Sequence, residues 1–193
     1  TDEEIKKEFI NYVNLILYSE KKEKYLSKNN FLFNKIKLIK EILPNSKFLI
    51  PIRDPLQQSY SLYKQHIHFL DLQRKDDFVR RYMSYLGHTE FGLDHKYWFE
   101  PQNFKDNQSI NYWMEQWQMF YKFMHQNFLD DNSCLFIKYD HLNNPNEIEK
   151  ILKFINVKDF KNFNFKIQKH SIKDVNYSSD LYSKSKEVYD NIS

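Results

Sequence analysis

The residues of this chain best suited to binding an anion lie in one short segment, residues 53–63, with the sequence Arg-Asp-Pro-Leu-Gln-Gln-Ser-Tyr-Ser-Leu-Tyr. Arg53 offers a planar guanidinium that pairs well with phosphate oxygens, and Ser61 offers a hydroxyl. Asp54 is a favoured N-cap and Pro55 is favoured at the first helical position, so a helix is expected to begin directly after Arg53. The free N–H groups and positive dipole end of such a helix suit a phosphate. The segment therefore predicts an anion site, with a nucleotide phosphate as the expected ligand.

An apolar run at residues 47–52 precedes this segment and is typical of a buried strand. Arg53 then stands at the carboxyl tip of the strand, which is where open α/β sheets bind ligands. Pro51 removes a hydrogen-bond donor from the strand, so we expect a bulge or local irregularity there. The simpler alternative to an anion site is a helix cap whose arginine makes a surface ion pair.

Residues 53–63 resemble the 3′-phosphate-binding motif of the sulfotransferases that use 3′-phosphoadenosine 5′-phosphosulfate (PAPS) as sulfuryl donor. The shared pattern is Arg-Asp-Pro, a serine eight residues after the arginine, and a tyrosine, Tyr63, two residues later. The resemblance implies that Arg53 and Ser61 hold the 3′-phosphate of PAPS, or of its product 3′,5′-adenosine bisphosphate (PAP), and that no metal takes part. Gln58 departs from the pattern, because many relatives have arginine there, and this could weaken an auxiliary contact.

A second segment resembles the same family independently of the first. A strand expected at residues 133–138 is followed by Tyr139-Asp140-His141-Leu142, and then by a proline-led helix that ends on Phe154-Ile155-Asn156-Val157. Sulfotransferases commonly have a Tyr-Glu-Asp-Leu segment, a proline-led helix and a similar ending in this order. The resemblance covers residues 25–72 and 130–157, and more weakly 181–189, where an amphipathic helix is expected.

The resemblance implies an α/β, helix-rich, P-loop-like sulfotransferase fold with a parallel sheet flanked by helices. Such proteins normally open with a strand and a Pro-x-Ser-Gly-Thr-like loop whose N–H groups cradle the 5′-phosphosulfate. This chain has only two glycines, Gly87 and Gly92, and neither has that context. We infer that the first strand, loop and helix of the family are missing from the chain. A truncated sequence fits better than a degenerate relative, because the remaining elements keep the order of the family.

The rest of the chain is expected to be helical within a single domain, residues 1–193. Amphipathic helices are predicted at 1–19 and 31–43, and the helix after Arg53 is predicted to reach about residue 72. Residues 73–128 are expected to form a helical insertion that could bind the acceptor. A stripe at helical spacing indicates a core-facing helix within it: Trp113, Trp117, Phe120, Tyr121 and Met124.

Sulfuryl transfer requires a base that deprotonates the acceptor and charge that stabilises the moving group. In sulfotransferases the base commonly follows the 5′ loop, so it could lie outside this chain. Within the chain, the candidates are His66 and His68 beside the motif, and His88 and Glu90 in the glycine-containing loop. Lys28 stands where relatives carry a lysine near the sulfuryl group and could stabilise its charge. Each of these residues has an alternative interpretation as an ordinary core or surface residue.

Composition narrows the classes of partner and compartment. A net charge of +3 gives no case for a nucleic-acid partner. The single cysteine, Cys134, excludes an internal disulfide framework and fits a reducing compartment. No apolar run reaches membrane length, and His88, Glu90 and His95 lack a recognised metal-ligand spacing. We therefore expect no membrane segment, no metal and a cytoplasmic location, unless an N-terminal anchor of the Golgi type precedes the sequence.

The leading hypothesis is a PAPS-dependent sulfotransferase that acts on a hydroxyl or amine of a small-molecule or carbohydrate acceptor. The alternative is a non-catalytic helical interaction module, with an exposed face at Trp113 and Trp117 that binds a partner, or a degenerate nucleotide-binding relative.

Overall fold

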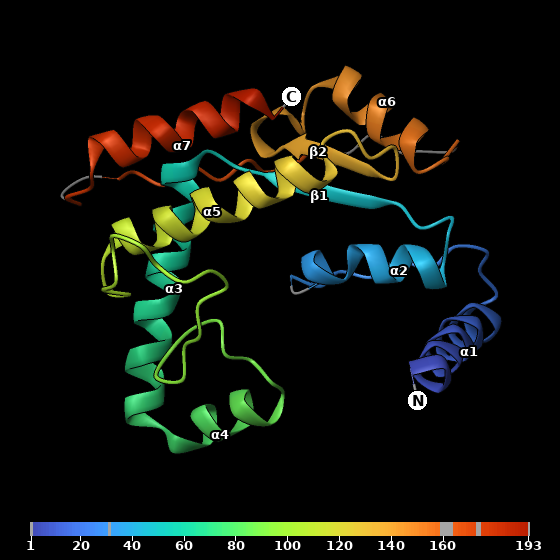
Figure 1. Ribbon diagram of the computed structural model, residues 1–193, viewed down its shortest axis with the longest axis horizontal. Helices are drawn as coiled ribbons and strands as arrows, with labels where there is room; N and C mark the ends of the chain where they lie inside the picture. The colour runs from blue at the N-terminus through green and yellow to red at the C-terminus, as the bar shows by residue number, and fades with distance from the viewer. Residues whose placement is uncertain (1, 31, 159–163, 173–174, 193) are drawn as a thin grey trace. The chain divides into compact units, whose positions relative to one another are not determined.

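The computed structural model describes residues 2–30, 32–158, 164–172 and 175–192 (Figure 1). Thr1 and Phe31, which the helix predictions included, lie outside the described residues. The described chain is α/β and rich in helix, with a small parallel two-stranded sheet flanked by helices. This confirms the expected fold class at that level. The chain divides into two compact units, Thr1–Phe48 and Leu49–Ser193.

The first unit is helical. It contains α1 (Asp2–Glu20), a short 3-10 helix, η1 (Leu32–Lys35), and α2 (Ile36–Ile42). The helix predicted at 1–19 is present, and the helix predicted at 31–43 is present as the 3-10 helix η1 followed by the shorter α2. Val13 of α1 and Ile36 at the start of α2 are its buried apolar residues.

The second unit holds the sheet and the remaining helices. Its elements are β1 (Phe48–Ile52, whose first residue falls in the first unit), α3 (Pro55–Lys75), α4 (Asp77–Tyr85), α5 (Ile110–Phe128), β2 (Cys134–Lys138), the 3-10 helix η2 (Tyr139–His141), α6 (Pro145–Phe154) and α7 (Ser179–Asn191). No helix in the described part of the chain combines the length and the apolar character that a membrane span needs.

The helix α5 lies at the centre of the second unit, where it packs against both α3 and α7 (Figure 1). Four of the five residues of its predicted core stripe are buried, with Trp113 only 3% and Trp117 only 2% exposed, whereas Phe120 is half-buried. Trp113 packs against Phe91 and Tyr112 in an aromatic cluster. The interpretation of Trp113 and Trp117 as an exposed partner-binding face is therefore wrong, because the neighbouring elements cover both rings.

The strand β1 runs without a break from Phe48 through Pro51 to Ile52. A two-stranded sheet leaves one edge of each strand unpaired, so a residue without an N–H can be accommodated there, and the expected interruption does not arise. Ile50 and Ile52 are buried at alternate positions, as a half-buried strand requires. The Pro51 carbonyl accepts a hydrogen bond from the Tyr121 hydroxyl of α5 (2.7 Å), which fixes the end of the strand against that helix.

Buried polar side chains of α5 anchor the long connection between α4 and α5. The Glu115 carboxylate, 4% exposed, accepts hydrogen bonds from the backbone N–H groups of residues 102–104 and from the Asn103 side chain, at 2.9 to 3.4 Å. The Gln116 amide accepts from the N–H groups of residues 98 and 99 and donates to the carbonyl of Phe99. These bonds allow an irregular segment to pack on a helix without leaving its backbone unpaired.

Both glycines lie in this connection and have positive φ angles, +73° at Gly87 and +85° at Gly92. Glycine adopts such angles at no steric cost, whereas other residues rarely do. At Gly92 a Cβ atom would also lie 2.3 Å from the Gln73 side-chain oxygen, so only glycine fits that approach to α3.

Candidate anion-binding site

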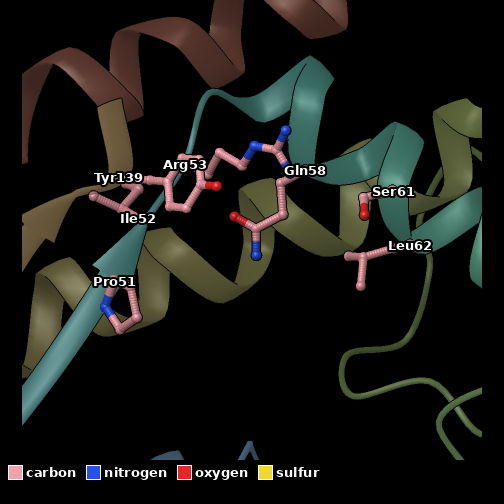
Figure 2. Close-up of a pocket in the computed structure, with 7 residues that line it drawn as sticks. All are labelled: Pro51, Ile52, Arg53, Gln58, Ser61, Leu62 and Tyr139. Atoms are coloured by element: carbon pink, nitrogen blue, oxygen red, sulfur yellow. The ribbon is translucent and has the colours of Figure 1, made fainter. Parts of the chain in front are cut away.

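A pocket of about 290 Å³ opens where β1 meets α3, within the second unit (Figure 2). Its polar lining consists of Arg53, Gln58, Ser61 and Tyr139, and its apolar lining of Pro51, Ile52 and Leu62. The structure thus brings both predicted phosphate-binding residues, Arg53 and Ser61, to one pocket. It adds Tyr139, which follows β2, because the two parallel strands end at the same edge of the sheet.

The local sequence explains why Arg53 stands at this edge. The Asp54 side chain accepts hydrogen bonds from the N–H groups of Leu56 and Gln57 (3.0 and 3.1 Å), so the cap and Pro55 start α3 directly after the strand. From α7, the Tyr182 hydroxyl donates to the second Asp54 oxygen at 3.3 Å. The turn between strand and helix is therefore held both locally and by a distant helix.

The guanidinium of Arg53 is oriented by contacts on three sides. Its Nη2 donates to the carbonyl of Gln168 (2.5 Å) and to the side-chain oxygen of Gln57 (3.3 Å). The group also lies over the ring of Tyr139, 5.1 Å from its centroid. A guanidinium has five N–H donors, so these contacts leave further donors for a ligand.

The side-chain amide of Gln58 bridges α3 and α5. Its oxygen accepts a hydrogen bond from the Trp117 indole N–H (3.1 Å) and lies 3.4 Å from the Tyr121 hydroxyl. The sequence comparison treats Gln58 only as a departure that weakens a contact. Its connection to α5 is a tertiary feature that no local pattern signals.

The segment of residues 165–170 passes close to the site and is held by side chains. The amide of Gln57 pairs with both backbone groups of His170 (2.7 and 3.0 Å), and the amide of Asn143 pairs with both backbone groups of Phe165 (2.7 Å each). Between them, the Gln168 N–H donates to the Tyr139 hydroxyl at 3.0 Å. Sequence reasoning misses this segment, because it has no helical or strand periodicity of its own.

The positive charge of Arg53 also affects the protonation of His170 in the 165–170 segment. Partial burial, together with the positive charges of Arg53 and Lys64, lowers the pKa of His170 below its ordinary value. The neutral form of this imidazole is therefore favoured beside the guanidinium, and His170 stacks edge-on against the ring of Tyr60 on α3.

The candidate base His66 does not line the pocket, although it lies on the same helix. It is fully buried, its Nδ1 accepts a hydrogen bond from the Gly92 N–H at 3.2 Å, and its ring contacts those of His95 and Trp113. Five residues beyond Ser61, it lies on a different face of the helix. Burial and the neighbouring His95 lower the pKa of His66 to about 4, so it is neutral at physiological pH.

The other candidates for catalysis are not among the residues that line the pocket. His68 is exposed on α3, and Lys28 is exposed in the first unit. His88 and Glu90 pair with each other in the connection between α4 and α5, with Nδ1 and Oε1 2.9 Å apart. Among the residues that the structure describes, no group of three or more His, Cys, Asp or Glu side chains is arranged to hold a metal ion.

Comparison with known proteins adds no relative to this picture. No family model matches the chain, and no match was found among the curated proteins or the solved structures.

Proposed function

We propose that the pocket binds a nucleotide phosphate, and that the chain is a PAPS-dependent sulfotransferase in which this pocket holds the 3′-phosphate of the donor. The observation that carries this proposal is that Arg53 and Ser61 line one pocket at the carboxyl tip of a strand, beside the N-terminus of α3. A guanidinium and a hydroxyl both favour a bound oxyanion. The first N–H groups of α3 do not add to them, because those of Leu56 and Gln57 already donate to the Asp54 side chain.

The charge of the pocket lining also supports an anionic ligand. Of the described residues that line it, Arg53 carries a positive charge and none is a carboxylate. The nearest acid in sequence, Asp54, is engaged by the cap of α3 and by Tyr182. An oxyanion in the pocket would therefore meet the positive charge of Arg53 and no carboxylate in the lining, and near a protein surface this attraction is stronger than in bulk water.

The size of the pocket limits how much of a nucleotide it would hold. Small-molecule sites usually enclose roughly 300–1,000 Å³, so a pocket of about 290 Å³ lies just below this range. This volume suits a phosphate with its attached sugar better than the whole of PAPS. It agrees with an assignment to the 3′-phosphate half of PAPS alone.

The acceptor in the proposed reaction is a hydroxyl or amine of a small molecule or carbohydrate. No pocket-lining residue is proposed as the catalytic base. The roles of His66 as a base and of Lys28 in stabilising charge remain predictions. Burial and its lowered pKa favour a packing role for His66 in the absence of a conformational change.

Titration calorimetry with PAP tests the proposal. We expect PAP to bind more tightly than adenosine 5′-monophosphate, because the latter lacks the 3′-phosphate. Arg53→Ala should lower the affinity for PAP about 100-fold, since it removes charge-assisted hydrogen bonds to the phosphate. Arg74→Ala is the matched control: Arg74 is exposed in the last turn of the same helix, and its removal should leave the affinity unchanged.

Two results would contradict the proposal. One is an affinity for PAP in the Arg53→Ala variant equal to that of the unmodified chain, with both proteins shown to be folded by circular dichroism. The other is equal binding of PAP and adenosine 5′-monophosphate, which would mean that the 3′-phosphate is not recognised.

A further inference from the structure

The Gln58 amide has an oxygen that accepts hydrogen bonds and a nitrogen that donates them, and its neighbours show which atom is which. An indole N–H only donates hydrogen bonds, so the Gln58 atom 3.1 Å from Trp117 Nε1 must be the amide oxygen. The Tyr121 hydroxyl donates to the Pro51 carbonyl at 2.7 Å, and its longer contact of 3.4 Å is with the same Gln58 oxygen. The hydrogen-bond network therefore fixes which way round the amide lies.

Tyr121 stays protonated in this arrangement. It is buried, at 3% exposed, and burial raises the pKa of its hydroxyl well above its usual value. Trp117 is 2% exposed, so both neighbours of the Gln58 oxygen belong to the packed core. The orientation of the amide is consequently set by rigid groups of α5 and not by solvent.

With its oxygen engaged, the amide nitrogen of Gln58 remains for the pocket. Figure 2 shows this nitrogen and the Ser61 hydroxyl pointing to the same side of α3. Residues three apart on a helix are neighbours on its surface, which agrees with that view. No described residue accepts a hydrogen bond from the Gln58 nitrogen, and the residue itself lines the pocket.

We propose that Gln58 is a fixed hydrogen-bond donor to the ligand, and that Trp117 and Tyr121 act as its positioning residues. This inference rests on the proposed function of the pocket. The nitrogen of a preorganised amide donates to a ligand oxygen without first losing rotational freedom, which makes its contribution larger than that of a mobile surface side chain.

The fixed donors define the ligand class. Arg53 and the nitrogen of Gln58 present only N–H donors to the pocket, and the hydroxyl of Ser61 can donate as well as accept. The site therefore favours an oxyanion, whose oxygens accept from these donors, over an amine-bearing ligand. The phosphate of a nucleotide and free inorganic phosphate share this chemistry.

The test is calorimetric titration of PAP and, separately, of inorganic phosphate into the unmodified chain and the Gln58→Glu and Gln58→Leu variants. Glutamate retains an acceptor for Trp117 and Tyr121 but replaces the donor by a negative oxygen, so PAP affinity should fall more than about tenfold. Leucine removes both ends of the amide, and the loss should be about tenfold. A response to PAP alone identifies the nucleotide phosphate as the ligand, and equal responses identify free phosphate.

Nuclear magnetic resonance can distinguish a ligand contact from a purely structural role of Gln58. The side-chain amide signal of Gln58 should shift on titration with PAP, whereas that of Gln116, which donates to Phe99 in the core, should stay in place. Trp117→Phe retains an aromatic ring but removes the indole donor, so it should lower PAP affinity by a few-fold and alter the Gln58 signal.

The outcomes separate this inference from the proposed function. If PAP binds, Arg53→Ala weakens its binding about 100-fold, and both the Gln58→Glu affinity and the Gln58 amide signal are unaffected, only the role of Gln58 is overturned. If neither PAP nor phosphate binds the unmodified chain, the proposed function fails and the inference fails with it.

Discussion

The two faces of α5 differ in how completely the polar groups beside them are hydrogen-bonded within the chain. On one face, the carboxylate of Glu115 and the amide of Gln116 are surrounded by backbone N–H and C=O groups of residues 98–104. On the other face, Trp117 and Tyr121 engage only the oxygen of the Gln58 amide, whose nitrogen is left facing a pocket. Polar groups that are saturated within the chain build a scaffold, whereas a polar group that is oriented but only half-paired is available to a ligand.

The largest effect is expected where the scaffold is most saturated. Glu115→Ala should lower the free energy of unfolding by about 4 kcal/mol, because it leaves several loop N–H groups without their buried acceptor. Urea denaturation measures this change. Glu149→Ala, at an exposed position on α6, is the control and should change the free energy of unfolding by less than about 0.5 kcal/mol. A loss of under about 1 kcal/mol for Glu115→Ala would mean that water replaces the carboxylate.

The next largest effect is expected at His66, which should make the stability of the folded chain depend on pH. Its pKa of about 4 in the folded chain lies below the ordinary value of 6.5, so the unfolded chain binds the proton first as the pH falls. The stability that depends on neutral His66 is thus complete above pH 6.5 and is lost between pH 6.5 and 4. At about 1.4 kcal/mol per pKa unit, the loss amounts to about 3 kcal/mol.

Chemical denaturation at a series of pH values measures the His66 contribution. His66→Gln retains an acceptor for the Gly92 N–H and should flatten the dependence between pH 6.5 and 4, whereas His68→Gln, at an exposed position, should leave it unchanged. His95 faces His66 in the core and also has a pKa lowered by burial, so some dependence should persist in the His66→Gln variant. Identical pH profiles for His66→Gln and the unmodified chain would refute the assignment.

The smallest effect is expected at Asn143, where the paired groups are exposed. Asn143→Ala removes two hydrogen bonds of 2.7 Å to the backbone of Phe165, which should cost about 1 kcal/mol of local stability. Hydrogen exchange at the Phe165 amide should then become about fivefold faster. Asn146→Ala, at an exposed position on α6, should leave that exchange rate as it is; an unchanged rate in Asn143→Ala as well would show that the segment is held by other contacts.

Elements with local signals could be predicted from the sequence. Asp54-Pro55 and Asn144-Pro145 each place a capping side chain before a proline, and α3 and α6 begin at those prolines. The apolar stripe of α5 predicts its buried face correctly. Periodicity does not say what a helix packs against, however, so a helix expected within an insertion, residues 73–128, occupies the centre of the second unit.

The candidate site also combines features that a local sequence pattern predicts with features that depend on tertiary contacts. The spacing of Arg53 and Ser61 is a local pattern, and both residues line the pocket. The orientation of Gln58 depends on Trp117, and the pairing of Gln57 depends on His170, which lie 59 and 113 residues away in the chain. Such contacts exist only after the chain has folded, so the sequence predicts the presence of a polar side chain but not the direction of its donors.

The 165–170 segment has a register, although it belongs to no sheet. Each of the two amides, Asn143 and Gln57, imitates a neighbouring peptide group by presenting one donor and one acceptor to a single residue. Together they fix the positions of Phe165 and His170, and therefore the number of residues that can lie between these two points. Adding or removing one residue between these points would break the pairing at one end, which ties the length of this segment to the position of Arg53.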